Sequence, residues 1–186
     1  MIGRLPKSVV VNGKTFELNT DYRVCLNVLQ AFSDPDLNEY EKSIVLIQCL
    51  YKDFDRIEAA DWQECINQGV WFLNCGDTVN KPQTERPLYD WEQDEQIIFS
   101  AINKVANKEV REVEYMHFWT FIALFNEIGE GSFSTIVSIR QKKSRGKKLE
   151  DWEREFYKKN KDLVDLKKKY TEEEQAEIDA LLKLLG

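Results

Sequence analysis

Residues 117–128 read HFWTFIALFNEI, the most apolar stretch of a chain of 186 residues. Apolar side chains would fall on almost every side of a helix through this stretch, and a helix that is apolar all round is usually buried. We therefore predict that 117–128 is the central core helix. Gly129-Glu130-Gly131 should end it, and Ser132 should cap a following helix that runs from Phe133 to about Gln141.

Apolar periodicity predicts further helices on the N-terminal side of this segment. Apolar residues recur there at steps of three and four, as on one face of a helix. Asn19, Thr20 and Asp21 are the N-cap candidates for the first of these helices. The predicted helices cover about 22–32, 38–53, 58–74 and 89–105.

A β-hairpin is predicted near the N-terminus. Ser8-Val9-Val10-Val11 is rich in β-branched residues, and the pair Asn12-Gly13 suits the positive φ angles of a type I′ turn. The alternation in Lys14-Thr15-Phe16-Glu17-Leu18 completes the pattern. Because a two-stranded hairpin is marginal alone in water, it must pack on another element or gain a strand from a partner.

The C-terminal region has the pattern of amphipathic helices. One long helix is predicted over 149–170, and a last helix follows a capping box from Thr171 to Glu174. Such helices can fold back on the core or reach outward to a partner, and the spacing leaves both open. The apolar and aromatic side chains that we predict to bind a partner are Trp152, Phe156, Leu163, Leu166, Tyr170, Leu181, Leu182 and Leu185.

These elements predict a mainly α fold, namely a helical domain with a short N-terminal β-hairpin and a C-terminal extension of one or two amphipathic helices. Charge suggests where the domain ends, because residues 1–139 carry 12 basic and 22 acidic side chains, whereas 140–186 carry 14 and 11. We predict an acidic helical domain over 1–139 and a charged helical extension over 140–186. Residues 76–88 form a loop, either a linker between two halves or an ordered surface loop.

A basic run precedes the C-terminal helices. Residues 140–148 contain no acid and six cations, namely Arg140, Lys142, Lys143, Arg145, Lys147 and Lys148. As a nucleic-acid patch the run lacks nearby aromatic residues for stacking, and the acidic body behind it would repel phosphate. We favour a solvated helix end or a docking surface for an acidic partner.

Residues suited to catalysis are scarce. His117 is the only histidine, which excludes a site with several histidines in one chain. It could act with Glu114, but its position at the start of an apolar helix favours a packed or capping histidine. Gly129-Glu130-Gly131-Ser132 lacks the other residues of a phosphate loop and is better explained as a helix end joined to a helix start. We expect no enzymatic activity.

Metal and cofactor sites are not expected either. The acidic cluster is formed by Asp90, Glu92, Asp94 and Glu95. A helix start explains it without a ligand, because Asp90 can cap the helix and acids suit the positive end of the helix dipole.

The cysteines indicate a reducing compartment. Cys25, Cys49, Cys65 and Cys75 form no CxxC pair, and each lies in an apolar run, so we predict buried free thiols. No stretch approaches the roughly 20 apolar residues of a membrane span, and residues 1–7 do not read as a secretory signal. We expect a soluble intracellular protein that does not enter a membrane.

Several short segments carry a family resemblance. They read YDWEQD at 89–94, IIFSAI at 97–102, YMHFWTF at 115–121 with Ala-Leu at 123–124, FSTIVSIR at 133–140, KKL at 147–149 and Phe-Tyr at 156–157. Together they resemble the bacteriophage gene-product-fifteen family of Gram-positive siphophages and prophages. The opening Leu5-Pro6, the hairpin and the helices up to Gly76 also fit, whereas residues after Tyr170 lie outside the resemblance.

The resemblance implies a phage tail-morphogenesis protein in the cytoplasm of the bacterial host. Members look like tail assembly chaperones, which coat the long helical tape-measure protein and help tail-tube subunits polymerise around it. The implied partners are the tape-measure and tail-tube proteins, and self-association is expected because many copies must line one long client. No catalytic residue is implied. Two alternatives stay open: a structural tail or connector component of the virion, and a nucleic-acid-binding accessory protein that uses 140–148.

Overall fold

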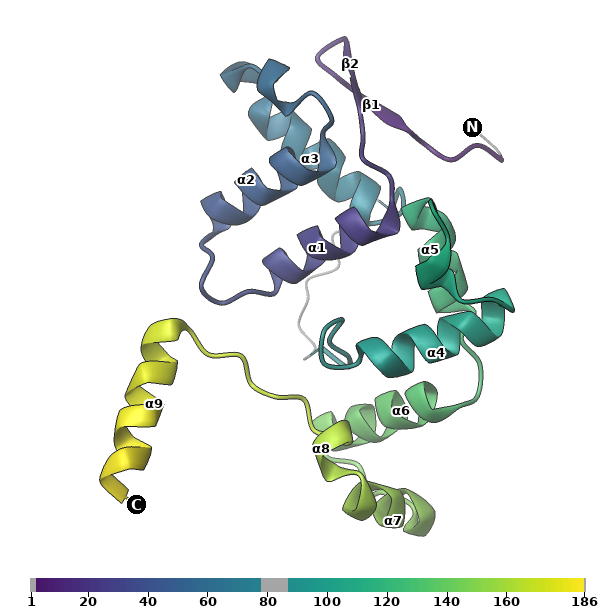
Figure 1. Ribbon diagram of the computed structural model, residues 1–186, viewed down its shortest axis with the longest axis vertical. Helices are drawn as coiled ribbons and strands as arrows, with labels where there is room; N and C mark the ends of the chain where they lie inside the picture. The colour runs from purple at the N-terminus through teal and green to yellow at the C-terminus, as the bar shows by residue number, and fades with distance from the viewer. Residues whose placement is uncertain (1–2, 78–86, 186) are drawn as a thin grey trace. The chain divides into compact units, whose positions relative to one another are not determined.

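The computed structural model of the protein describes residues 3–77 and 87–185, with side chains up to residue 183. The chain forms two compact units. The first contains the described residues of 1–78 and of 168–186, and the second those of 79–167. Helices predominate in both units and a short hairpin lies near the N-terminus, which confirms the predicted mainly α fold (Figure 1).

The hairpin has the predicted register. β1 (Ser8–Val11) pairs antiparallel with β2 (Lys14–Glu17), and Val11 lies opposite Lys14 across the turn. Asn12 and Gly13 have φ angles of 49° and 82°, as a type I′ turn requires. β1 packs on helix α3, which gives the hairpin the support that it needs.

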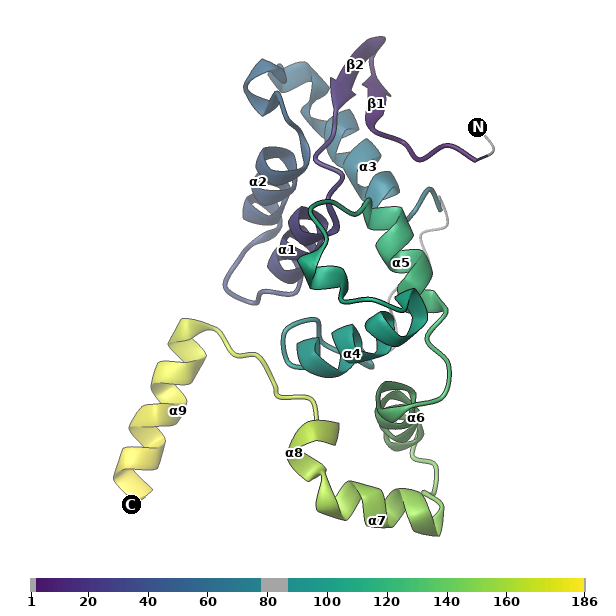
Figure 2. The ribbon, with the colours of Figure 1, turned by 45° about the vertical axis from the view of Figure 1, so that its right-hand side comes forward.

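Helices α1 (Tyr22–Phe32) and α2 (Glu39–Leu50) form an antiparallel pair, visible in Figures 1 and 2. Asp21 caps α1 through the amide of Arg23, as predicted. Asn38 and Glu41 form a capping box at the start of α2. These caps explain why both helices begin close to the predicted residues.

Helix α3 (Trp62–Leu73) packs closely on α2. A Cβ atom added to Gly69 would lie 2.6 Å from a methyl group of Leu46, so any larger residue would force the Leu46 side chain to shift. A short 3-10 turn, η1 (Phe54–Arg56), precedes the helix predicted from residue 58, and a second one, η2 (Ala59–Asp61), takes the place of its first turn.

The second unit contains α4 (Glu95–Ala106), η3 (Val110–Glu112), α5 (Phe118–Asn126), α6 (Ser132–Ser144), α7 (Asp151–Lys159) and α8 (Lys161–Val164). α4 packs against α5 and α6, and α8 packs against α6 and α7 (Figure 2). α4 begins six residues later than predicted, because the Asp90 carboxylate accepts the amides of Glu92 and Gln93 and caps a separate turn.

The apolar helix α5 differs from the prediction of a central core helix. Phe118 and Phe121 are buried, but Thr120 and Ala123 are exposed, so the helix buries one side rather than its whole circumference. Aromatic rings cover part of it, since Trp91 stacks at tilted angles on Phe121 and on Phe125. The start of the next helix is also corrected: Ser132 is the first residue of α6, whose cap is Gly131.

The predicted long helix over 149–170 is broken into α7 and α8. Asn160 separates them, with its amide and its side-chain nitrogen both bound to the carbonyl of Phe156. α8 then ends at Val164, and the chain continues without helix to 171. The predicted domain boundary between 139 and 140 falls inside α6, and most of the predicted loop over 76–88 lies outside the described residues.

Helix α9 (Glu172–Leu185) follows the predicted capping box. The Thr171 hydroxyl accepts the amide of Glu174, and the Glu174 carboxylate accepts the amide of Thr171. The amide of Glu172 donates to the carboxylate of Asp36, at 2.8 Å, in the loop between α1 and α2.

Candidate partner-binding surfaces

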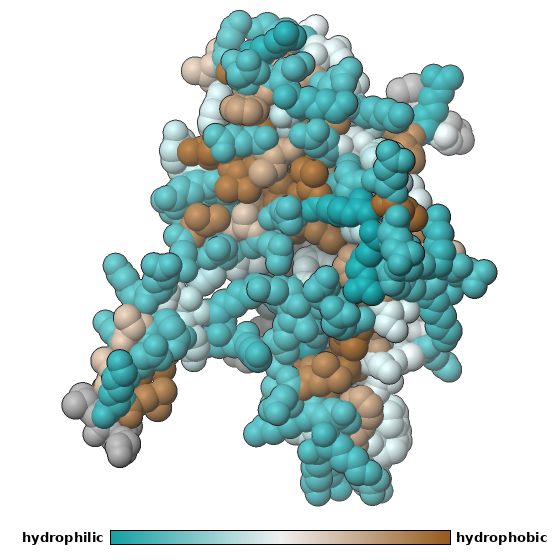
Figure 3. All heavy atoms as spheres, in the orientation of Figure 1, coloured by the Kyte–Doolittle hydropathy of each residue, from teal (hydrophilic) through white to brown (hydrophobic). Residues whose placement is uncertain are grey.

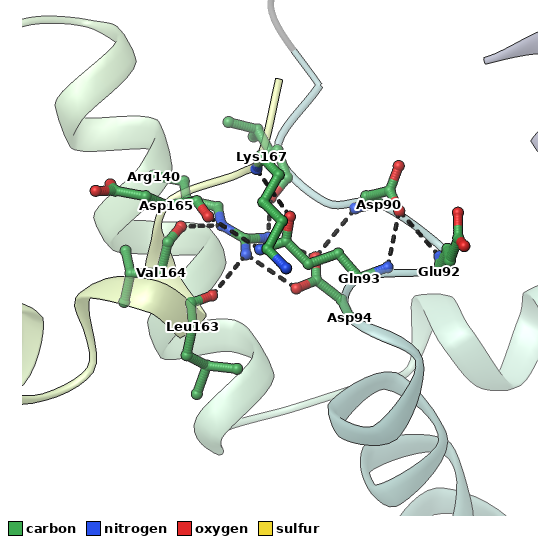
Figure 4. Close-up of polar contacts among 10 residues, drawn as sticks. Asp90, Glu92, Gln93, Asp94, Arg140, Leu163, Val164, Asp165 and Lys167 are labelled. Atoms are coloured by element: carbon green, nitrogen blue, oxygen red, sulfur yellow. Dashed lines mark hydrogen bonds and ion pairs between the residues drawn. The ribbon is translucent and has the colours of Figure 1, made fainter. Parts of the chain in front are cut away.

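Arg140, predicted as part of an exposed basic run, is buried in the second unit. Its side chain is 6% exposed, and that of its partner Asp94 is 0% exposed. Both terminal nitrogens of Arg140 donate to the Asp94 carboxylate (Figure 4). The prediction of a solvated or docking side chain is therefore wrong for Arg140, because a guanidinium with such a bidentate partner can be held inside a protein.

Arg140 also binds backbone carbonyls from distant parts of the unit. Its Nε donates to Val164 at 2.6 Å, one terminal nitrogen donates to Leu163 at 2.9 Å, and the other donates to Leu88 at 3.0 Å. We call Arg140, Asp94 and these three carbonyls the Arg140 clasp. A continuing α8 would need the carbonyls of residues 163 and 164, so the clasp explains why α8 ends there.

Gln93 extends the clasp by two further bonds (Figure 4). Its side-chain nitrogen donates to the carbonyl of Asp165 at 2.9 Å, and its side-chain oxygen accepts the amide of Lys167 at 2.9 Å. Residues 163–167 are therefore fastened to the start of α4. All of these polar groups bind one another, so the clasp is a structural feature of the unit rather than a site with free chemistry.

Two lysines of the basic run also bind partners within the unit. Lys142 donates to both oxygens of the buried Glu153 carboxylate at 2.7 Å, and this bond lowers the pKa of Glu153. Lys143 pairs with Asp165, which also accepts the Tyr157 hydroxyl. Burial opposes ionisation of Asp165, but these two bonds lower its pKa.

The remaining cations, Arg145, Lys147 and Lys148, are exposed. Arg140, Lys142 and Lys143 are thus engaged within the unit. This reduces the positive surface that a nucleic acid could use, because affinity for phosphate grows with the number of cations that reach it.

The apolar residues predicted to bind partners differ in their burial. Phe156 and Leu163 pack against a buried cluster in the second unit, formed by Ile136, Ile139 and Val164, and so hold α7 and α8 in place. Leu166 and Tyr170 are half-buried. The exposed group is Trp152 on α7 and Leu181 and Leu182 on α9, whose exposed fractions are 58%, 59% and 62%. The side chain of Leu185 lies outside the described part of the chain.

A further apolar surface lies over α1 and α2 (Figure 3). Several apolar residues of these helices are only half-buried, namely Val24, Leu26, Leu29, Phe32, Ile44 and Val45. Sequence reasoning missed this surface because it assigned the apolar residues of both helices to the core. The number of apolar residues could have indicated this surface. Besides the buried Tyr22, Cys25 and Val28, α1 carries further apolar residues that its buried face does not accommodate.

His117 has the predicted capping role. It is the N-cap residue of α5, it is buried, and its Nδ1 accepts the amide of Trp119 at 3.1 Å. Among the acids predicted to cluster at the start of α4, Asp94 binds Arg140 and Asp90 caps a turn. Within residues 3–77 and 87–185, no group of three or more histidines, cysteines and acids is placed to hold a metal ion.

The cysteines are free, as predicted. Cys25 and Cys65 are buried, whereas Cys49 and Cys75 are half-buried, so burial is confirmed for two of the four. Burial raises the pKa of the Cys25, Cys65 and Cys75 thiols. No helix in the described part of the chain is long and apolar enough to cross a membrane.

Fold and surfaces together define a class: a small helical protein whose buried polar groups serve its own structure and whose apolar side chains partly face outward. The family is shown directly, because the model of the Bacteriophage Gp15 protein family matches residues 1–166. The chain belongs to this family and is a bacteriophage protein. No curated protein and no solved structure matches it.

Proposed function

We propose that the protein is a tail assembly chaperone, which binds the tape-measure protein in the cytoplasm of the bacterial host and helps the tail tube assemble, without catalysing a reaction. The observation that carries the proposal is the apolar surface over the helix pair α1–α2 (Figure 3). Membership of the phage family supplies the biological setting.

The chemistry of the client fits this surface. A tape-measure protein is a long, mostly helical chain, and its apolar stripes would aggregate if they stayed exposed. An amphipathic helix can bind by laying its apolar face on an apolar surface between two helices. The half-buried residues of α1 and α2, such as Leu26 and Leu29, provide an apolar face of this kind.

The charge of the chain fits the same role. The net charge is −7, so a complex whose apolar faces are covered still presents like charges to its neighbours and stays dispersed. The tail-tube protein is the second proposed partner, since a chaperone must release its client to the growing tube.

Co-expression tests the proposal. The tape-measure protein encoded by the same phage should become more soluble when this chain is produced with it. Leu26→Ser combined with Leu29→Ser should abolish the gain, because both changes remove apolar area from α1. A matched control is Val105→Ser with Tyr115→Ser, which removes exposed apolar side chains from the second unit and should leave the gain intact.

Two results would count against this function. An unchanged soluble fraction of the tape-measure protein would remove its main support, provided that circular dichroism shows the chain to be folded. Stoichiometric presence of the chain in purified phage particles, measured by mass spectrometry, would instead favour a structural tail or connector component.

A further inference from the structure

We propose that the protein associates head to tail with a second copy of itself, with α9 of one copy docked on the exposed surface around Trp152 of the next. The proposal does not depend on the chaperone function. It also concerns a helix outside the family match, which ends at residue 166. Three observations support it: an apolar stripe on α9, an exposed tryptophan on α7, and opposite charges on the two surfaces.

The docking element is α9, which has apolar side chains on one stripe. Leu181 and Leu182 lie three and four positions after Ile178, so the three side chains share a face of the helix. Leu181 and Leu182 are among the most exposed large apolar side chains of the described chain. Figure 3 shows apolar atoms of α9 at the surface, beside hydrophilic ones. Two exposed leucines on one short helix are most simply explained by a partner that covers them.

The charge of α9 is strongly negative. Residues 170–186 contain five acids and one lysine, a balance of −4. The acids are exposed and are Glu172, Glu173, Glu174, Glu177 and Asp179. A partner surface that is both apolar and basic would complement this helix.

The second unit offers such a surface. Trp152 is 58% exposed at the start of α7, and tryptophan is a frequent anchor at the centre of protein interfaces. Lys147 and Lys148 precede it, and Lys158 and Lys159 end the same helix; all four are exposed. Among the exposed side chains of residues 145–167, eight are basic and four are acidic, a balance of +4, and Glu150, Asp151 and Glu155 near Trp152 are three of those acids. The acceptor surface therefore has the sign opposite to that of α9.

Charge also selects the geometry of association. A symmetric contact between two α9 helices would bring two balances of −4 together, which like-charge repulsion opposes. A contact between α9 and the Trp152 surface joins opposite charges instead. Because each copy has one of each surface, the contact is heterologous, and heterologous contacts build open chains unless the rotation closes a ring.

The contact should be weak and sensitive to salt. A helix of 14 residues is about 21 Å long at roughly 1.5 Å per residue, so one face buries less area than a standard stable interface. Exposed opposite charges attract less as ionic strength rises. Association should therefore appear at micromolar or higher protein concentrations and fall when salt is added.

Sedimentation velocity of the full chain tests the proposal, with no tape-measure protein present. The mean sedimentation coefficient should rise with protein concentration at about 0.05 M salt and fall back at about 0.5 M. The donor variant Leu181→Ala with Leu182→Ala should stay monomeric, and alanine preserves the helix. The acceptor variant Trp152→Ala with Lys148→Glu should also stay monomeric. The control Val105→Ala with Lys108→Glu also removes apolar area and reverses one charge, in the last turn of α4 and just beyond it, and should associate like the intact chain.

Mixing the two variants provides the decisive measurement. The donor variant keeps its Trp152 surface and the acceptor variant keeps its α9, so a mixture should form pairs but no longer oligomers. Formation of pairs also shows that both variants are folded. Association of the acceptor variant by itself would overturn the proposal in favour of an α9–α9 contact. A monomeric intact chain at every concentration would overturn it as well, since α9 would then have no second copy as its partner.

Discussion

Replacement of Arg140 by methionine should destabilise the protein more than any change to the exposed lysines of the same run. Methionine has an unbranched apolar side chain but cannot donate, so the Asp94 carboxyl, whose side chain is 0% exposed, would lose its buried partner. The carbonyls of Leu88, Leu163 and Val164 would each lose the donor that Arg140 supplies. Removal of one partner from a buried ion pair costs about 3–5 kcal/mol.

That loss is large on the scale of the whole molecule. The free energy of unfolding of a domain is typically about 5–15 kcal/mol, so a loss of about 3–5 kcal/mol is roughly a fifth of that free energy at the least. For a chain of this length, each kcal/mol shifts the midpoint of thermal unfolding by about 2–4 °C, which gives an expected decrease of about 6–20 °C. Circular dichroism at 222 nm can follow this transition.

A double variant separates the ion pair from the backbone bonds. Asp94→Leu combined with Arg140→Met removes both charges, so the penalty of an unpaired buried charge disappears. The carbonyls still lack their donor, and the Asp90 amide loses the Asp94 carboxylate as its acceptor. The double variant should therefore unfold at a higher temperature than Arg140→Met alone. Lys148→Met is the matched control, because it removes one cation from an exposed position of the same run and should leave the midpoint almost unchanged.

Hydrogen exchange gives a local test of the same reasoning. The amide of Lys167 donates to Gln93, beside the clasp, and should exchange faster in Arg140→Met even at temperatures where the protein is folded. A decrease in midpoint equal to that of Lys148→Met, with unchanged exchange at Lys167, would refute the structural role of the clasp.

Three further predictions concern other contacts. Hydrogen bonds from Asn12 and Lys14 lower the pKa of Asp61, so its carboxylate stabilises the docked hairpin at neutral pH and this contribution is lost as pH falls below the ordinary aspartate pKa of about 3.9. The difference in urea midpoint between the intact chain and Asp61→Asn should therefore be present at pH 7 and shrink below about pH 4; a constant difference would contradict the assignment. His117→Asn should keep the cap of α5, whereas His117→Ala should lower the free energy of unfolding by about 1 kcal/mol in urea titrations, and equal stability of the two variants would exclude the capping role. Thiol labelling of the native chain should modify Cys49 and Cys75 first, and Cys25 and Cys65 only after denaturant is added, because the last two are buried; labelling of all four at one rate would contradict this order.

Local features of the sequence predicted the local features of the fold. The Asn12-Gly13 turn, the caps at Asp21 and His117 and the capping box at Thr171 each depend on residues within a few positions of one another. Such short-range bonds are encoded in adjacent residue types, which is why spacing alone identified them.

Long-range polar contacts were not predictable in the same way. Arg140 and Asp94 are 46 positions apart, and each belongs to a charged stretch that looks like an ordinary solvated helix end. Nothing in one sequence marks a particular cation of a basic run as buried. The break after α8 was missed for the same reason, because the carbonyls of Leu163 and Val164 accept bonds from a side chain far away in the sequence.

The apolar residues show a related limit. Phe156 and Trp152 lie on the same short helix and have similar spacing, yet one packs on the cluster around Ile136 and the other is exposed. Periodicity identifies an apolar face but not which of its members a neighbouring helix will cover. The sequence therefore could not show that Trp152, Leu181 and Leu182 are the exposed members of the set predicted to bind partners.

The Arg140 clasp also determines the order in which the second unit can be completed on the ribosome. Its parts are synthesised far apart in time: Leu88 and Asp94 emerge first, Arg140 much later, and the last carbonyls at 163 and 164 later still. Until residue 164 has left the exit tunnel, the cation and its acceptors cannot all meet. The contacts among β1, β2 and the first three helices involve only residues that are synthesised early. The N-terminal part of the chain can therefore fold while the rest is still being translated.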